Sequence, residues 1–326
     1  MSVIVVTGAA GFIGSSVCHQ LLDQDYQIIA IDNMNDYYDT RLKEWRLQKL
    51  KEHKKSKKNF TFYRCDIEDL ESLTNICQKY KIDAIINEAA RAGVRYSIEN
   101  PHIYLTTNAN GNLNLLEICK KHNINKYILA STSSLYAGQP MPFQECLPVN
   151  EPISPYAASK KAAEAMAYSY HHLFDLDVTI LRYFTVYGPA GRPDMAPLRF
   201  IKWTLEGTPL TIYGDGSQTR DFTYVEDIAR GTIKALKPMG FEVINLGNNH
   251  PDKISKLIEL IEEKTGKKSI RQHKPFHKAD MIATWANVEK ANQLLGWKPE
   301  VSLEEGVERS VRWAKESWDW VRKVSV

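Results

Sequence analysis

The sequence has few of the features that mark membrane, secreted or nucleic-acid-binding proteins. Among its 326 residues, no apolar run approaches the roughly 20 residues that a membrane-spanning helix needs. The first residues lack the basic segment and small-residue cleavage site of a secretory signal. The 42 Lys and Arg residues nearly balance the 39 Asp and Glu residues, so a net charge of +3 gives no reason to expect a nucleic-acid partner. We therefore expect a cytoplasmic protein that binds neither nucleic acid nor membrane.

Cysteine is scarce and irregularly spaced. The chain has five cysteines, an odd number, and no C-x-x-C pair. This pattern favours neither a disulfide framework nor a zinc site, so we expect reduced, mostly buried thiols and no bound metal. The five residues are Cys18, Cys65, Cys77, Cys119 and Cys146.

The first 187 residues alternate between strand and helix patterns. Short runs that are apolar throughout are separated by amphipathic segments of helical length. Strands that are apolar on both sides indicate a parallel sheet covered by helices on each face. The expected strands are Val3–Thr7, Gln27–Asp32, Phe60–Arg64, Ala84–Asn87, Tyr127–Ser131 and Val178–Tyr183, and the expected helices are Gly11–Leu22, Leu70–Tyr80, Ile103–His122 and Tyr156–Phe174.

The pattern changes after about Gly188, where prolines interrupt it. Beyond them the sequence predicts short strands at Leu210–Tyr213 and Ile270–Lys274 and helices at Ile254–Thr265 and Leu303–Val321. The apolar run 242–246 is expected to return to the main sheet, with 225–236 as its crossover helix. One domain would then comprise residues 1–187 plus about 224–247, and a smaller, discontinuous α/β lobe would comprise about 188–223 and 248–326.

Three glycines follow the first strand at regular spacing. Gly8 allows a tight turn, Gly11 lets the backbone approach a pyrophosphate, and Gly14 lets the next helix pack against the strand. The helix begins near Phe12 and Ile13, where free N–H groups and the positive end of the helix dipole favour phosphate. The spacing is G-x-x-G-x-x-G, and in this strand–turn–helix context it predicts a dinucleotide site on a Rossmann-type, doubly wound parallel sheet.

Acidic residues follow the second and third strands. Asp32 lies 18 positions after Gly14, where a carboxylate can accept hydrogen bonds from the adenosine ribose and would repel a 2′-phosphate. The next residue is Asn33, not an arginine, so NAD is expected rather than NADP. Asp66 and Ile67 are placed to contact adenine, although Asp66 is equally suited to cap a helix.

A possible proton-transfer pair is spaced four residues apart. Tyr156 and Lys160 share one face of the helix expected there. A nearby ammonium group, together with the positive nicotinamide of NAD⁺, would lower the pKa of the Tyr156 phenol, which could then act as a base. Hydroxyls at Thr132, Ser133 and Ser134 follow the fifth strand, and the carboxyl ends of parallel strands are where ligands bind in such sheets.

These motifs together resemble the extended short-chain dehydrogenase/reductases that act on nucleotide sugars. The resemblance covers nearly the whole chain and includes the segments 106–111, 181–188 and 220–227. Gly188–Ala196 is similar to the G-P-x-G-R-P-D-M-A segment of the UDP-glucuronate 4-epimerase family, and Ala89–Ser97 fits the same family. Asn87 and Ala190 depart from the residues usual there.

The resemblance implies specific ligands and partners. It implies a tightly bound NAD that is recycled in each turnover, with Ala89 and Asn108 in its site, and a UDP-sugar held by the second lobe. Ser133 and Ser134 would contact this substrate, and Thr185 would lie near the sugar. Arginine donates bidentate hydrogen bonds well, so Arg220 would pair with the diphosphate and Arg192 with the C6 carboxylate. The family also implies a homodimer formed through the helices 103–122 and 156–174.

The implied reaction starts with oxidation at C4 of the sugar. Related dehydratases carry an Asp-Glu pair, and decarboxylases a Glu, where this chain has Ser133 and Ser134. We therefore expect 4-epimerisation of UDP-glucuronate to UDP-galacturonate through a 4-keto intermediate, with Tyr156 as the base. The alternatives are a 4-epimerase of UDP-glucose or UDP-N-acetylglucosamine, a UDP-glucuronate decarboxylase, and a non-catalytic NAD sensor.

Overall fold

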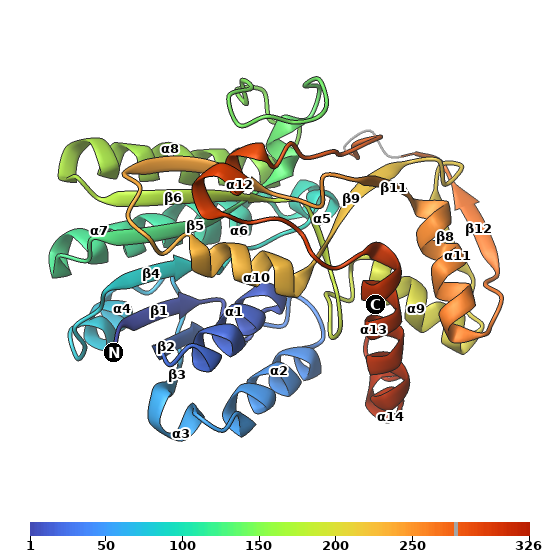
Figure 1. The fold of residues 1–326 in the computed structure, drawn as a ribbon, viewed down its shortest axis with the longest axis horizontal. Helices are drawn as coiled ribbons and strands as arrows, with labels where there is room; N and C mark the ends of the chain where they lie inside the picture. The colour runs from blue at the N-terminus through green and yellow to red at the C-terminus, as the bar shows by residue number, and fades with distance from the viewer. Residues whose placement is uncertain (277–279) are drawn as a thin grey trace.

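Seven parallel strands form the central sheet (Figure 1). The computed structural model describes residues 1–276 and 280–326. The strand order is β10-β6-β5-β4-β1-β2-β3, and each neighbouring pair is parallel, which confirms the predicted fold class. The strands are β1 Val3–Thr7, β2 Gln27–Asp32, β3 Phe60–Arg64, β4 Ala84–Asn87, β5 Lys126–Thr132, β6 Asp177–Tyr183 and β10 Phe241–Leu246.

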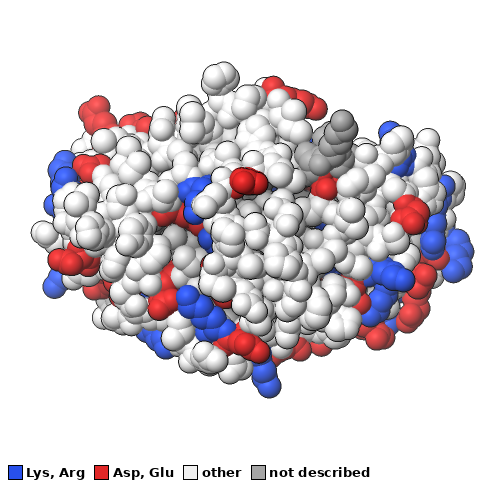
Figure 2. Space-filling view, turned by 90° about the horizontal axis from the view of Figure 1, so that it is seen from above, with Lys and Arg blue, Asp and Glu red and all other residues white. Residues whose placement is uncertain are grey.

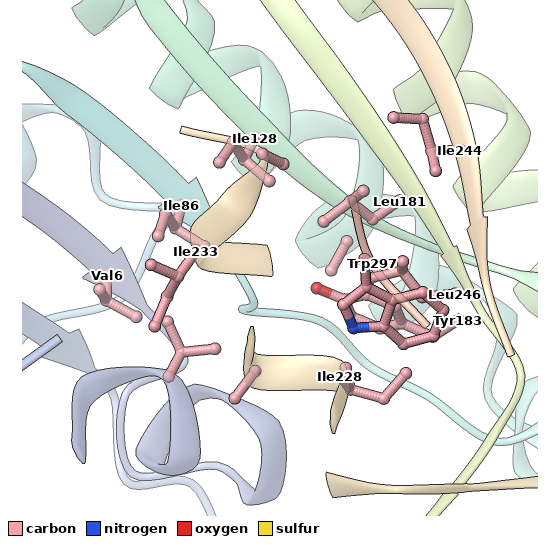
Figure 3. Close-up of a cluster of buried hydrophobic side chains, with 14 of the residues drawn as sticks. Val6, Ile86, Ile128, Leu181, Tyr183, Ile228, Ile233, Ile244, Leu246 and Trp297 are labelled. Carbon is pink, nitrogen blue, oxygen red and sulfur yellow. The ribbon is translucent and has the colours of Figure 1, made fainter. Parts of the chain in front are cut away.

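One face of this sheet packs against α1 (Phe12–Asp23) and α10 (Val225–Lys234). Val6, Ile86 and Ile128 project from the strands toward Ile228 and Ile233 of α10 (Figure 3). As the sequence predicted, β10 returns to the sheet beside β6, with α10 as the crossover helix.

The opposite face of the sheet packs against α4 (Leu70–Cys77), α7 (Asn112–His122) and α8 (Pro155–Phe174). Val5, Ile85 and Leu129 point to this side and pack with Leu115 of α7 and Ala163 of α8. Since successive residues of a strand point to opposite faces, both covered faces require apolar side chains. This explains why the strands read as unbroken apolar runs.

The helix expected over 103–122 contains a π-helical segment. The structure has α5 (Val94–Glu99), α6 (Pro101–Leu105), a π-helical stretch at Thr106–Gly111 and then α7. The single helix expected over 303–321 is likewise divided into α13 (Leu303–Glu316) and α14 (Trp318–Val321).

Smaller sheets and helices occupy the other end of the molecule (Figure 1). A third apolar cluster packs Tyr187, Phe200, Leu257 and Val307 together. The elements of this region are β7 Thr185–Tyr187, α9 Ala196–Glu206, β8 Leu210–Tyr213, β9 Thr219–Tyr224, β11 Pro251–Lys253, α11 Ile254–Thr265 and β12 Arg271–Lys274. Helix α12 (Glu289–Leu295) packs instead against α10 and β10 at the main sheet.

The sequence did not predict α2 (Thr40–Glu52), nor the single turn α3 (Ser56–Asn59) after it. The buried face of α2 carries Lys43 and Arg46 among Leu42, Leu47 and Leu50. Two charged residues on the inner face hide the apolar periodicity by which an amphipathic helix is recognised.

Charges of both signs are interspersed over the face of the molecule seen from above (Figure 2). This distribution agrees with the near-neutral total of +3. Within the described residues, no helix is both long and apolar enough to cross a bilayer.

Candidate active site

A cavity lies at the carboxyl ends of β1, β2, β4, β5 and β6. Parallel α/β sheets bind their ligands at this edge. All but two of the predicted site residues line it, and those that do are Gly8, Gly11, Phe12, Ile13, Gly14, Asp32, Asn33, Asp66, Ile67, Ala89, Thr132, Ser133, Ser134, Tyr156, Lys160, Thr185 and Arg192.

The glycine turn is held closely against its neighbours. Gly8 has a φ of +63°, and a Cβ there would lie 2.7 Å from the backbone nitrogen of Ala89. A Cβ on Gly14 would lie 2.2 Å from the carbonyl oxygen of Gly8. Side chains at these two positions would therefore displace the backbone of the turn. Gly11, the N-cap of α1, has no side chain to cap the helix, so the N-terminus of α1 faces the cavity and is open to a phosphate group.

Asp32 is fixed at the end of β2. Its carboxylate accepts hydrogen bonds from the backbone nitrogens of Ala10 (3.0 Å) and Met34 (2.8 Å). Lys43 of α2 lies 3.7 Å from the same carboxylate and also lines the cavity. No sequence pattern indicated Lys43, because α2 itself was not predicted.

Asp66 is not the cap of α4. It accepts hydrogen bonds from Asn33 Nδ2 (2.7 Å) and from the backbone nitrogen of Glu68 (3.0 Å). The N-cap is Asp69, which accepts a hydrogen bond from the backbone nitrogen of Ser72 at 2.9 Å. Asp66 thus joins two cavity-lining segments, those after β2 and β3.

Tyr156 and Lys160 lie in the first turns of α8 and face the cavity. Burial raises the pKa of Tyr156, while Thr132 and Arg192 act to lower it. Lys160 Nζ donates a hydrogen bond to the Ala130 carbonyl at 2.8 Å. Burial lowers the pKa of Lys160 to about 8, so its ammonium group remains largely charged at neutral pH.

A buried ion pair lies behind the hydroxyl-rich end of β5. Arg182 of β6 donates two hydrogen bonds to Glu164 of α8, at 2.7 and 3.0 Å, and each side chain is only 4% exposed. Glu164 also accepts a hydrogen bond from Ser131 at 2.6 Å, and Arg182 donates one to Tyr136 at 2.8 Å. This network fixes the strand end that carries Thr132.

Arg192 reaches the cavity from the loop after β7. Its Nε donates to Asp194 Oδ1 at 3.0 Å, and its Nη2 pairs with the other oxygen of the same carboxylate. The guanidinium group lies 5.9 Å from the centre of the Tyr37 ring. Arg192 thus holds one carboxylate, that of Asp194, in a bidentate fork.

Arg46 of α2 connects the two loops that border the cavity. It is 3% exposed and donates hydrogen bonds to the carbonyls of Ala190 (3.0 and 2.6 Å) and Gly191 (3.1 Å). It also donates to the carbonyl of Ala10 in the glycine turn at 3.2 Å. One buried side chain therefore fixes the loop of Arg192 relative to the glycine turn.

Asn108 does not line the cavity among the described residues. Its side chain accepts a hydrogen bond from the Arg91 backbone nitrogen (2.8 Å) and donates to the Arg91 carbonyl and to Ser159 Oγ (2.9 Å each). These bonds hold the loop after β4 against α8, and the direct cofactor contact expected of Asn108 stays a prediction.

Arg220 also lies apart from the described lining of this cavity. It donates to the backbone carbonyls of Thr219 (2.8 Å) and Ile282 (3.2 Å). Burial lowers the pKa of Arg220, and the charges of Asp280 and Arg95 act on it in opposite directions. Arg220 therefore lies beside Thr219 and Ile282, outside the described lining of the cavity that Arg192 enters.

His19, Asp23 and His53 are the described residues whose side chains are grouped closely enough to hold a metal ion. His53 Nδ1 accepts a hydrogen bond from the backbone nitrogen of Lys55 at 3.3 Å. His53 Nε2 then carries the hydrogen that faces Asp23 at 3.1 Å. These hydrogen bonds account for the close approach of His53 and Asp23.

A glycine turn beneath a dinucleotide-sized cavity, with a Tyr156–Lys160 pair at the same sheet edge, defines a short-chain dehydrogenase/reductase. The sequence profile of the family described as GDP-mannose 4,6 dehydratase matches residues 5–310. UDP-glucuronate 4-epimerase of Thermodesulfobacterium geofontis is 52% identical over the full length of both chains. UDP-glucuronate 4-epimerase 4 of Arabidopsis thaliana is 38% identical, over 95% of this chain and 74% of that protein.

A solved structure shows the same fold. The UDP-glucuronic acid 4-epimerase of Bacillus cereus, in complex with UDP-glucuronic acid and NAD, superposes with a TM-score of 0.90 at 40% identity, covering 97% of this chain and 99% of that one. The chain belongs to the UDP-glucuronate 4-epimerase family of extended short-chain dehydrogenase/reductases.

Proposed function

We propose that the protein converts UDP-glucuronate to UDP-galacturonate by epimerisation at C4, with a tightly bound NAD that is recycled in each turnover. The observation that carries this proposal is the position of Arg192, which lines the same cavity as Tyr156 and Thr132. A carboxylate-binding group beside a proton-transfer group suits a uronic acid substrate. The relatives named above support the same reaction.

The residues of the cavity fit NAD. The closely packed glycine turn leaves the N-terminus of α1 free for the pyrophosphate, and the Asp32 carboxylate suits the adenosine ribose. We assign Gly8, Gly11, Phe12, Ile13, Gly14, Asp32, Asn33, Asp66, Ile67 and Ala89 to this site. When bound, NAD⁺ would take up a hydride from C4 and return it to the opposite face of the sugar.

The protein side chains would handle the proton and the carboxylate. Tyr156 would remove the proton of the 4-hydroxyl and later return it, and Thr132 would hydrogen-bond the reacting oxygen. Lys160 would supply a fixed positive charge beside them, and Ser133, Ser134 and Thr185 would contact the sugar. A 4-keto uronic acid is a β-keto acid that loses CO₂ readily, so Arg192 would hold the carboxylate in place of Asp194 and keep it out of alignment with the ketone.

The diphosphate would lie over a second group of arginines. Burial lowers the pKa of both Arg199 and Arg220, and the positive charge of Arg95 lowers it further in each case, so both lie near Arg95. Arg199 Nε is buried without a hydrogen-bond partner among the described residues, and Arg95 lies 3.6 Å from the centre of the Tyr213 ring. We assign Arg220 to the diphosphate through this group, in the lobe formed by about 188–223 and 248–326, with residues 1–187 and about 224–247 as the NAD-binding domain.

A homodimer is part of the proposal. Leu105 of α6 and Met166, Leu173 and Phe174 of α8 are exposed apolar residues on the helices expected to pair. Sedimentation velocity of the wild type should give twice the monomer mass, and Leu173→Glu should lower it if this face forms the contact. The cytoplasmic location expected from the sequence can be checked by fractionation of the source cells.

The proposed reaction is tested by incubating the purified protein with UDP-glucuronate and no added cofactor. UDP-galacturonate as the product would support both the reaction and the retained NAD. A pentose product with CO₂ would indicate decarboxylation instead, and activity only with neutral UDP-hexoses would refute the uronate substrate.

Arg192→Gln tests the carboxylate assignment. Losing one partner of a buried charge pair costs about 2–5 kcal/mol, so kcat/KM for UDP-glucuronate should fall by at least about 30-fold. The amount of bound NAD should stay the same. Arg312→Gln, on the exposed side of α13, is the matched control. Equal kcat/KM values in the two variants would show that Arg192 does not bind the substrate carboxylate.

A further inference from the structure

Glu88 places a carboxyl group in the wall of the active-site cavity. It follows β4 and lines the same cavity as Tyr156 and Lys160. The proposed reaction assigns it no role. Glu88 is partly buried, and a carboxyl group with little access to water needs a proton, a cation or hydrogen-bond donors, so its partners influence its protonation state.

The Glu88 carboxyl begins a short chain of hydrogen bonds. The hydroxyl of Tyr183 lies 2.6 Å from Glu88 Oε1 and 2.8 Å from Thr232 Oγ1. The hydroxyl of Thr232 in turn donates to the carbonyl of Ile228 at 2.9 Å. Tyr183 is 6% exposed and Thr232 is fully buried, so the chain leads from the cavity into the core between β6 and α10.

The number of hydrogens available along this series of hydrogen bonds decides which group donates in each bond. The Ile228 carbonyl can only accept, so the single hydrogen of Thr232 is used there. The contact between Tyr183 and Thr232 then requires the single hydrogen of Tyr183. The contact between Glu88 and Tyr183 is left without a hydrogen unless Glu88 supplies one. All three contacts are hydrogen bonds only when the Glu88 carboxyl is protonated.

We propose that Glu88 is a neutral carboxylic acid that donates a hydrogen bond to Tyr183, and that its ionisation adds a negative charge which keeps Lys160 protonated. Glu88 is in this view a positioning residue, which acts on the reaction through Lys160. Its effect on turnover rests on the proposed function, whereas its protonation state does not.

Glu88 should ionise within the pH range in which the protein can be assayed. Burial raises the pKa of Glu88 to about 7, while Tyr183 and Lys160 act to lower it. The titratable groups that face Glu88 are Lys160 from α8, Tyr183 from β6 and the buried Cys18 from α1; α10 contributes the uncharged Thr232. Burial lowers the pKa of Lys160, and the charges of Glu88 and Glu164 oppose that decrease.

Glu88→Gln isolates the charge from the hydrogen bond. The glutamine amide can still donate to Tyr183, so the chain stays intact, but no negative charge can form. Without that charge Lys160 should lose its proton at a lower pH. The alkaline decline of kcat should therefore begin at least half a pH unit lower in Glu88→Gln than in the wild type. Coinciding profiles would overturn the effect on Lys160.

Infrared difference spectroscopy tests the protonation state without any substrate. The wild type at pH 5.5 should show the carbonyl stretch of a protonated carboxylic acid, weakening by pH 8.5, and Glu88→Gln should lack that part of the signal. Glu300→Gln, which removes an exposed carboxylate, is the matched control and should resemble the wild type. Identical pH differences in the wild type and Glu88→Gln would show that Glu88 does not change its protonation state between pH 5.5 and pH 8.5 and would overturn the proposal. Absence of turnover with every UDP-sugar would refute the proposed function, and the infrared result would still decide the state of Glu88.

Discussion

The buried pair of Glu164 and Arg182 should contribute strongly to stability as long as both partners are present. Both side chains are 4% exposed, and two hydrogen bonds join them directly. Arg182→Met would leave the Glu164 carboxylate with Ser131 as its remaining partner. Stranding one charge of a buried pair costs about 3–5 kcal/mol, so the free energy of unfolding should fall by that amount.

Urea unfolding at pH 7.5 measures this loss. With a slope of about 3 kcal/mol per M, the midpoint of Arg182→Met should fall by roughly 1–1.7 M. The double variant Arg182→Met/Glu164→Leu removes the stranded charge and should recover part of the loss. Arg312→Met, which breaks an exposed pair with Glu308, should change the free energy of unfolding by no more than about 0.5 kcal/mol. The reasoning is refuted if Arg182→Met and Arg312→Met have the same midpoint, or if the losses in the double variant simply add.

Three further predictions concern the site. Tyr156→Phe removes the proposed base and should lower kcat at least about a thousandfold with the bound NAD retained, as absorbance and product assays can measure; turnover near the wild-type rate would exclude Tyr156 as the base. Gly14→Ala puts a Cβ 2.2 Å from the Gly8 carbonyl oxygen, so the purified protein should carry much less NAD, whereas Ser15→Ala should keep its full content. Glu88 binds a proton more tightly when folded, since its pKa is raised from 4.5 to about 7, so its contribution to stability is lost as the pH rises through about 7. Melting temperatures between pH 5 and pH 8 should accordingly fall further in the wild type than in Glu88→Gln, and equal decreases would contradict the raised pKa.

The central sheet was predictable because it depends on local, repeated signals. The inner strands β1, β2, β4, β5 and β6 are buried on both faces, so their apolar runs are visible in the sequence alone. Gly8 and Gly14 could be assigned because a turn and a close helix–strand contact admit no side chain. Tyr156 and Lys160 lie one helical turn apart, and the sequence could therefore place both on one face of α8.

The residues that the sequence could not place depend on contacts between distant segments. Lys43 and Arg46 lie on a helix whose buried face is partly charged, so no apolar periodicity revealed it. The hydrogen bonds that join Asn108 to Arg91 and Ser159 carry no sequence signal, because the partners come from separate segments. Arg199 carried no motif of its own, and its proximity to Arg95 arises only from the packing of α9.

The position of Arg46 has a thermodynamic consequence for the two ligand sites. It donates hydrogen bonds both to Ala10, beside the proposed pyrophosphate site, and to Ala190 and Gly191, which precede Arg192. A dinucleotide that orders the first loop would thereby lower the conformational entropy that a sugar nucleotide must remove from the second. Binding free energies are reciprocal, so each ligand would raise the affinity of the other by the same factor, and Arg46→Met would bring that factor toward one.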